Sequence, residues 1–571
     1  MNKLFKYMAI GAVALASTAC LDLEPKDQLA DGNLWSAPGD FESFANKFYE
    51  WTPNFGMIYD DYIHCDKRSD LLADRGSRNV YSNGTNTVPE KDGDYTGAYE
   101  RIRRCNLLIE NSKKYPNLED IRQSVGEAYF FRAWCYFQLM QKYGDVIIVD
   151  EPIDVTDPRM NAPRDDRSLV TDFMVEDLRQ ATELLKPTSD VAEGRIGWEG
   201  AQAFLSRVAL YEGTWQKFRG NEARGKELCG IAATAAKTVM ESGKFELFRP
   251  AALGDSAQKY MFILEDTQCN GAGLTKGDNK EYIFKTCFDQ TLKPIGKNVT
   301  REVLVSGAQI VSAKFANMYL CSDGLPIEKS PKFQGYQTVK SEWMNRDNRM
   351  RYTLRRPGDN FWSNINSRID WSGSAEEIAA AESKNYLPNA GSGYAPQKWA
   401  TERKVDNNYE SYDYPIIRYA EVLLNYAEAV YERDDAISDA DLNISLNLTR
   451  QRVNKDMPAL TNSFAAANGL SMREEIRRER TIELFQEGFR IDDLKRWKTA
   501  EIEMPMDFLG IKWTGEWQSR WGNPGLPTNA DGNLIYETGR NWEEKHYLYP
   551  LPIDQLQLNP KLGQNPGWAG L

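Results

Sequence analysis

The sequence predicts a mostly all-α fold, a scaffold of helical hairpins interrupted by long irregular loops. Apolar residues recur at three- and four-residue steps in several segments, which is the spacing of one helix face. Small residues such as Ala128, Ala201 and Ala427 stand where such helices would cross. The segments between them have little periodicity and are rich in glycine, asparagine and aromatic residues. These features indicate tetratricopeptide-like hairpins stacked as a solenoid.

The first residues of the chain form an export signal. Two lysines precede an apolar run over residues 8–16, and three small residues then lead directly to Cys20. Small residues before a cysteine are typical of a bacterial lipobox, and the apolar run is too short to span a bilayer. We therefore predict that residues 1–19 are a lipoprotein signal peptide, that Cys20 is lipidated, and that residues 20–571 form the body.

Helical periodicity is clearest in five segments of that body. The first ends at Gly144 and the second before Pro187, because glycine and proline are common helix terminators. In the last, Ser471 and Glu474 have the spacing of an N-terminal capping box. The predicted helices cover residues 125–143, 168–185, 199–215, 417–431 and 471–486.

Domain organisation follows from the distribution of these helices. We expect the helical scaffold to occupy about residues 39–245 and 414–500. Segments of about 52–96, 245–410 and 500–571 are irregular but rich in aromatic residues, which argues against disorder. We therefore expect these segments to be ordered loops that form a ligand face.

Composition excludes several function classes. The chain has 70 lysines and arginines against 83 aspartates and glutamates, a formal net charge of −13, which disfavours nucleic acid and anionic lipid headgroups as partners. Beyond Cys20, seven cysteines are scattered without a Cys-x-x-Cys pair, so a disulfide framework is not expected. Only two histidines are present, and no glycine-rich phosphate loop or nucleophile elbow is found.

One cluster of acids resembles catalytic carboxylates. Glu479, Glu483 and Glu487 share a helix face at four-residue spacing, with Arg477, Arg480 and Arg490 beside them. An acid pair for glycoside hydrolysis would have this composition, but glutamates beside arginines are more often ion-pair networks. We interpret the cluster as structural, and we expect the protein to bind rather than to catalyse.

Seven phrases in a fixed order carry a resemblance to a known family. They are AYFFRAWCYFQLMQKYGDV (128–146), GRIGWEGAQAFLSRVALYEGTW (194–215), MYLCSDGLPI (318–327), NRDNRM (345–350), YPIIRYAEVLLNYAEAVYE (414–432), IRRERTIELFQEGFRIDDLKRW (476–497) and YLYPLPIDQLQLNPKLGQNPGW (547–568). In this order, after a lipobox, they resemble the SusD/RagB family of outer-membrane nutrient-binding lipoproteins. The resemblance spans nearly the whole mature chain.

That resemblance implies a fold and a role. It implies four tetratricopeptide-like hairpins, an irregular half with the ligand face, and a lipid-anchored position facing the cell exterior. It also implies a SusC-like TonB-dependent barrel as partner and an oligosaccharide or polysaccharide as cargo. Peptide cargo, as in RagB-like members, is an alternative, and so is a tetratricopeptide scaffold that binds only protein. A lipid-anchored glycosidase is the least favoured hypothesis.

Candidate binding residues come from loop composition. A protein holds a sugar by stacking flat aromatic rings on its apolar face and by hydrogen bonding its hydroxyls, so both residue types must meet on one surface. Two of the irregular segments mix them. The candidates are Trp371, Arg368, Tyr394, Asp66, Trp51, Tyr59, Asp60 and Trp362.

No cofactor is expected from the sequence. A structural Ca²⁺ is the one ion left open, because a run of aspartates in the first irregular segment offers the oxygen ligands that calcium prefers. These aspartates are Asp60, Asp61, Asp66, Asp70 and Asp74.

Overall fold

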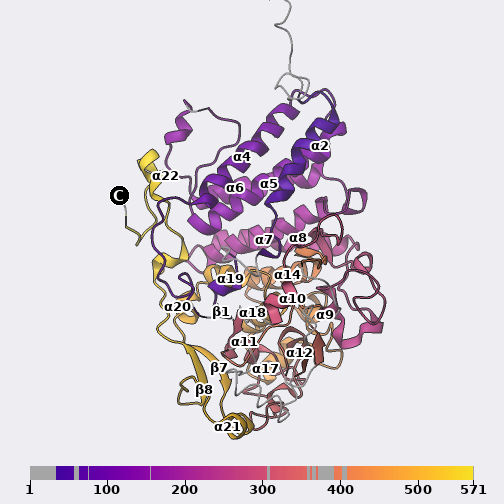
Figure 1. Cartoon of the computed structure of the whole chain (residues 1–571). Coiled ribbons are helices and arrows are strands. Elements are labelled where there is room, and N and C mark those ends of the chain that lie inside the picture. The colour runs from indigo at the N-terminus through magenta and orange to yellow at the C-terminus, as the bar shows by residue number, and fades with distance from the viewer. Residues whose placement is uncertain are drawn as a thin grey trace, which may run out of the picture.

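The computed structural model describes most of the body of the chain. The described residues are 34–56, 64–74, 76, 78–154, 156–304, 309–356, 360–362, 368–370, 391–401 and 408–569. The predicted signal peptide and Cys20 therefore lie outside the described residues. The fold is mostly helical, as predicted, with long helices in one half and short elements in the other (Figure 1). Among the described residues, no helix combines the length and the apolar character needed to cross a membrane.

Helices α4, α5, α6, α7 and α8 form a stacked array in the upper half of Figure 1, with α14 and α18 below it. Each packs on the next, α4 on α5, α5 on α6, α6 on α7 and α7 on α8, after which α8 packs on α14 and α14 on α18. Their bounds are α2 Pro38–Asn46, α4 Gly93–Ser112, α5 Leu118–Tyr143, α6 Arg167–Leu184, α7 Trp198–Lys217, α8 Glu222–Glu241, α14 Tyr419–Asp434 and α18 Met472–Glu483. Contact between sequence neighbours is the arrangement that helical hairpins predict.

Helix α5 shows why these segments fold locally. Its N-cap, Asn117, accepts a hydrogen bond from the backbone of Glu119, and Gly144 ends it in a positive-φ conformation that glycine adopts without strain. Between these caps the helix is buried on nearly all sides. An apolar sequence all round a helix indicates such burial. The sequence therefore located this helix and its end correctly.

The five predicted helices are all present, with shifted ends. Helix α5 begins seven residues before the predicted start because Leu118 follows a good N-cap. In α6 the cap is Asp166, whose side chain accepts from the backbone of Ser168. Ile417 was expected inside a helix but lies in strand β6, and α14 begins two residues later. Helix α18 ends at Glu483, three residues before the predicted end.

The other half is built from short elements. Its helices are α9 Ala257–Met261, α10 Val299–Leu304, α11 Ala313–Met318, α12 Asn348–Thr353, α15 Asp439–Asn443, α16 Leu446–Arg450, α17 Asn462–Ala467, α19 Arg490–Arg496, α20 Ala500–Glu503, α21 Glu516–Trp521 and α22 Ile553–Leu558. The 3₁₀ turns are η1 Lys47–Trp51, η2 Asp66–Arg68, η3 Pro158–Asn161, η4 Thr188–Asp190, η5 Ala251–Ser256, η6 Lys276–Asp278, η7 Ser341–Trp343, η8 Glu544–Tyr547 and η9 Pro560–Leu562.

Short strands occupy segments that were predicted to be loops, except for β6, which lies at the start of the second predicted scaffold region. They are β1 Leu72–Asp74, β2 Tyr282–Thr286, β3 Gln309–Val311, β4 Asn360–Trp362, β5 Arg368–Asp370, β6 Tyr414–Arg418, β7 Phe508–Lys512 and β8 Asn533–Glu537. They form four two-stranded antiparallel sheets, β1–β3, β2–β6, β4–β5 and β7–β8. Strands of three to five residues are too short for an alternating pattern to be read.

A buried ion network joins the two halves through α18. Glu483 contacts Arg349 at 3.0 Å, Arg418 at 2.7 Å and Arg452 at 2.8 Å. Burial alone would raise the pKa of the Glu483 carboxyl, but Arg452 and the other two arginines lower it to about 2. Glu479 pairs with Arg349 as well. The structure therefore confirms that these glutamates are ion-paired, and Glu487 pairs with Arg418 at 2.7 Å. The arginines beside them in the sequence have other partners, since Arg480 contacts Asp493 at 2.9 Å and Arg490 contacts Asp70 at 2.8 Å.

Seven of the eight cysteines lie among the described residues, and none of the seven is in a disulfide. Six are buried, and Cys287 is half-buried. They pack as small apolar side chains, which is how buried free cysteines usually behave.

Candidate binding site

A cleft of about 1200 Å³ opens in the irregular half of the molecule. Three segments far apart in the sequence form it: residues 249–255 around η5, residues 340–351 from η7 into α12, and residues 451–457 after α16. Two of these segments lie in the predicted ligand-face region, and the third interrupts the predicted scaffold. The volume of the cleft exceeds the usual range for a drug-sized ligand, so the cleft has room for a chain of several sugar or amino-acid units.

Helix α12 and its cap form one wall of the cleft. Asp347 caps the helix by accepting from the backbone of Arg349. Asn454 donates its amide to Asp347 at 2.7 Å and accepts from the backbone of Asn348 at 2.8 Å, which ties the 451–457 segment to this wall. Because these bonds are buried or partly buried, the wall is held in place without a ligand.

Polar atoms dominate the lining. Asn345 is exposed at the cleft in a left-handed conformation that asparagine tolerates, with φ at 57°. Trp343 is 8% exposed, which is too little for an open stacking face. Hydrogen bonding and charge therefore matter more than ring stacking in this cleft.

Tyr394 and Asp66 differ from the expectation that they face a ligand. Tyr394 is 1% exposed and donates its hydroxyl to Glu342 at 2.6 Å. Asp66 is 4% exposed and accepts from the backbone of Gln486 at 2.7 Å. Burial raises the pKa of Asp66 to about 7. Both side chains are occupied inside the protein, because their loops fold back onto α18 and its neighbours.

Trp51 lies elsewhere. It is half-buried against Phe48 and Phe131, with ring centroids 5.0 and 5.9 Å away, and it lines a second cavity of about 280 Å³ between α5, α7 and α19. That cavity also contains His64, whose Nδ1 lies 2.6 Å from Asp492. The structure therefore does not bring Trp51 into the larger cleft.

Two other predicted residues lie opposite each other on paired strands. Strands β4 and β5 pair so that Trp362 stands opposite Arg368, which the sequence did not indicate. Trp371, Tyr59 and Asp60 lie outside the described residues, so their place in a site remains a prediction.

The described aspartates of the first irregular segment are engaged with protein groups. Asp70 pairs with Arg490 at 2.8 Å and with Lys314, and Asp74 pairs with Lys67 at 2.9 Å. Each of these carboxylates thus already faces a cation, which does not fit a calcium site. Asp60 and Asp61 lie outside the described residues.

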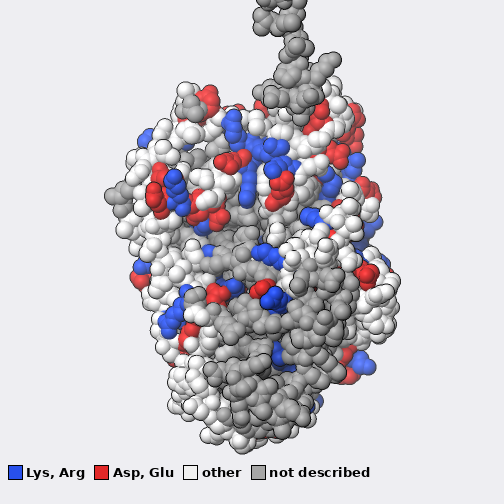
Figure 2. Space-filling model, in the orientation of Figure 1, with Lys and Arg blue, Asp and Glu red and all other residues white. Residues whose placement is uncertain are grey.

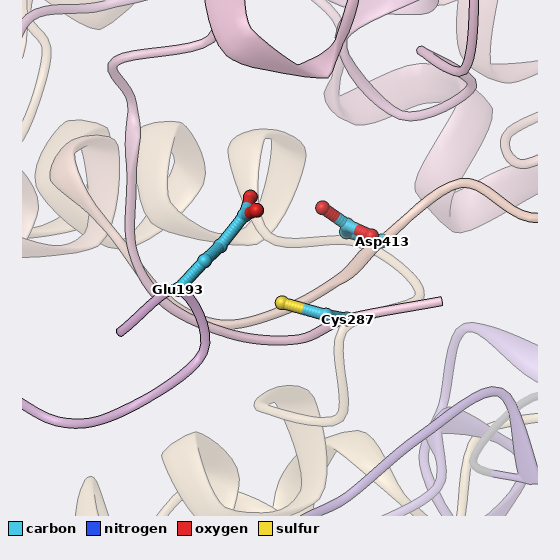
Figure 3. Close-up of side chains that lie close together, drawn as sticks. All are labelled: Glu193, Cys287 and Asp413. Carbon is cyan, nitrogen blue, oxygen red and sulfur yellow. The ribbon is translucent and has the colours of Figure 1, made fainter. Parts of the chain in front are cut away.

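Among the described residues, Glu193, Cys287 and Asp413 are spaced so that they could hold a metal ion, and Figure 3 shows them close together. Cys287 and Asp413 lie together because Thr286 of β2 pairs with Tyr414 of β6. Lys285 contacts both Glu193 and Asp413, at 2.5 and 2.8 Å, and Lys276 contacts Asp413 at 2.8 Å.

Those lysines decide what the cluster is. Two ammonium groups already neutralise the two carboxylates, and burial together with Asp413 raises the pKa of the Cys287 thiol to about 11, so sulfur stays protonated. A cation would have to displace these ammonium groups, and we interpret the cluster as an ion network.

Fold and cleft together define the class of the protein, a helical-repeat scaffold carrying an open polar binding cleft. The SusD family model matches residues 274–568, more than half of the chain. A second model, described as starch-binding and associating with the outer membrane, matches residues 44–210. The chain belongs to the SusD family, as the ordered phrases indicated.

Solved structures show the same fold. A SusD-like protein from Bacteroides fragilis superimposes with a TM-score of 0.72 at 23% identity, covering 95% of this chain and 100% of that one. A SusD-like carbohydrate-binding protein from the same species gives 0.72 at 22% identity, covering 93% and 100%. A SusD-like protein from Formosa agariphila is 24% identical over 233 residues, which span 37% of this chain and 43% of that curated relative.

The residues that line the cleft were not predicted from the sequence. Trp343 and Asn345 were not singled out, although the phrase at 345–350 that carries the family resemblance forms one wall. A tryptophan two residues before a run of polar and charged residues was an available signal. Nothing in the sequence showed that residues 249–255 and 451–457 would join it.

Proposed function

We propose that this chain is a cell-surface glycan-binding lipoprotein that captures an oligosaccharide or polysaccharide and passes it to a SusC-like TonB-dependent transporter. The observation that carries the proposal is the open cleft of about 1200 Å³ with exposed amide, carboxylate and cationic side chains, in a chain of the SusD family. The family description of starch binding and outer-membrane association supports both the cargo class and the location.

Capture proceeds by hydrogen bonding, and no covalent bond is made or broken. A prebuilt wall lowers the entropy cost of binding because its side chains are already ordered. Acylation of Cys20 holds the protein at the outer membrane facing the exterior, since several acyl chains give lasting attachment where one does not. The loop aromatics Trp371, Trp362 and Tyr59 remain the proposed stacking platforms.

Isothermal titration calorimetry of the chain from residue 21 onward, against a panel of polysaccharides and peptides, tests this proposal. We expect at least one glycan to bind and to be recovered chemically unchanged. If a peptide binds and no glycan does, the RagB-like peptide alternative replaces the proposal. Turnover of a bound oligosaccharide would contradict the non-enzymatic role.

A further inference from the structure

The cleft differs in charge from the rest of the protein. Seven basic side chains line it against three acidic ones, although acids outnumber bases in the whole chain by 83 to 70. The basic residues are Arg249, Lys340, Arg346, Arg351, Arg356, Arg452 and Lys455, and the acidic ones are Asp255, Asp347 and Asp456.

Internal pairing does not remove this surplus. Arg452 is neutralised by Glu281 and Glu483 behind the cleft wall, at 3.0 and 2.8 Å. Asp347 is neutralised by Arg349 at 2.7 Å. Arg356 also interacts with other groups of the protein. Without these three residues, the lining has five basic side chains and two acidic ones.

Three of those cations are exposed and without a carboxylate. Among the described residues, no carboxylate lies within ion-pair distance of Arg249, Lys340 or Lys455. Arg351 has only a long contact with Asp255, at 3.9 Å. On the face that Figure 2 shows, basic and acidic side chains lie side by side over the stacked helices in the upper half. A concave surface with one sign of charge concentrates ligands of the other sign.

A buried cation, Arg346, lies beneath the cleft. Arg346 is 7% exposed and donates to the backbone carbonyls of Glu342, Ala316 and Tyr319 at 2.8 to 2.9 Å. Its Nε has no hydrogen-bond acceptor among the described residues, and no carboxylate there pairs with it. Buried charges in proteins are normally paired with an opposite charge. Arg346 therefore adds a positive charge beneath the cleft that no carboxylate among the described residues contacts directly.

We propose that this cleft selects an anionic glycan, one that carries carboxylate or sulfate groups. The inference rests on the proposed function, which makes the cargo a glycan, and it specifies the chemical class. Carboxylates and sulfates match guanidinium and ammonium donors in charge and in hydrogen-bond geometry. The amide of Asn345 and the exposed part of Trp343 can contact the sugar ring itself.

Calorimetry with defined probes tests the charge preference. The probes are an oligogalacturonate for carboxylates, a chondroitin sulfate oligosaccharide for sulfates, maltoheptaose as a neutral glycan and poly-glutamate as an acidic peptide. We expect one of the two anionic glycans to bind at least tenfold more tightly than maltoheptaose. Raising NaCl from 0.05 to 0.5 M should weaken that binding several-fold, because salt screens exposed charges.

A variant locates the effect in the cleft. Replacing the three exposed cations together, by Arg249→Gln, Lys340→Gln and Lys455→Gln, should weaken binding of the anionic glycan about tenfold, since one exposed ion pair contributes a factor of about 1.4 to 5. The matched control removes three exposed lysines from the scaffold, by Lys186→Gln, Lys226→Gln and Lys244→Gln, with the same change in net charge. It should leave binding unchanged.

Other outcomes of these measurements would contradict the inference or the proposed function. Tighter binding of maltoheptaose, without salt dependence, overturns the inference and leaves the proposed function standing. Equal weakening in the cleft variant and the control also overturns it, because bulk charge would then be responsible. Binding of poly-glutamate at the affinity of the anionic glycans removes the specificity for sugar. If no saccharide of either kind binds, the proposed function fails together with the inference.

Discussion

Arginines behave differently in two adjoining regions of the molecule. Around α18, Arg349, Arg418 and Arg452 are buried, and each contacts at least two carboxylates. Around the cleft, Arg249 and Lys340 contact no carboxylate among the described residues, and Arg346 donates its hydrogen bonds to backbone carbonyls. Arg452 belongs to both regions, since it lines the cleft while its charge is neutralised from behind.

The difference separates structural from available charge. A buried arginine that is fully paired fixes the relative positions of the elements it joins, and removing one partner leaves a charge uncompensated. An exposed arginine without a partner contributes little to stability and remains free to contact a ligand. Stability and binding should therefore respond to different substitutions, although the two regions touch.

The largest expected effect is on stability, at the centre of the ion network. Glu483→Gln removes the carboxylate shared by three buried arginines, and we expect a loss of about 3 to 5 kcal/mol in the free energy of unfolding. Urea denaturation followed by tryptophan fluorescence measures it. Glu474→Gln on the same helix is the control, since its side chain is 63% exposed, and it should change stability by less than about 0.5 kcal/mol. Equal effects in the two variants would end the distinction between the regions.

The next effect concerns pH and lies just behind the cleft. Burial raises the pKa of Glu342 to about 7, above its ordinary value of 4.5, although Tyr394 and Arg346 oppose the shift. The folded protein therefore favours the neutral carboxyl, which stabilises it below about pH 4.5. That stabilisation is lost as the pH rises through 7.

Glu342→Gln cannot ionise, so it should remove this loss. We expect urea midpoints between pH 5 and 8 to fall less steeply in the variant, with a difference of about 1 to 3 kcal/mol at pH 8. Glu328→Gln, at an exposed position, is the control and should follow the parent protein. Parallel pH profiles for Glu342→Gln and the parent would contradict the buried neutral carboxyl.

The smallest expected effect is on the stability of the cleft variant. Joint replacement of Arg249, Lys340 and Lys455 by glutamine should change the free energy of unfolding by less than about 0.5 kcal/mol, because exposed substitutions without partners rarely matter. The same urea measurement checks it. A loss of several kcal/mol would show that these cations are structural and would remove the contrast with α18.

Much of the fold was predictable because its signals are local. Periodicity and caps lie within a few residues of each other, so α5 and its terminating Gly144 could be read directly. Strand pairs were missed because their partners are distant, as with Tyr282 of β2 opposite Arg418 of β6. An antiparallel pair of this kind leaves little trace in either segment alone.

The binding residues were less predictable for the same reason. Composition selected loops with aromatic and polar residues, but it could not distinguish Tyr394, which folds inward onto Glu342, from a residue that faces a ligand. Asp66 was misjudged for the same reason, since its carboxylate accepts from the backbone after α18, which is far away in the sequence. Burial is decided by what packs on a residue, and that partner is often hundreds of positions away.

By itself, the sequence determined the helices of the scaffold, the family and the expectation of a lipid anchor on Cys20, because each depends on contiguous residues. It also contained the glutamates and arginines of α18 as an ion-pair pattern. Only the tertiary structure decided which charges meet, since pairs such as Glu483 with Arg349 or Arg418 join segments far apart in the chain. Arg249, Lys340 and Lys455 line the cleft without a carboxylate in contact among the described residues, and only the tertiary structure brings them together there.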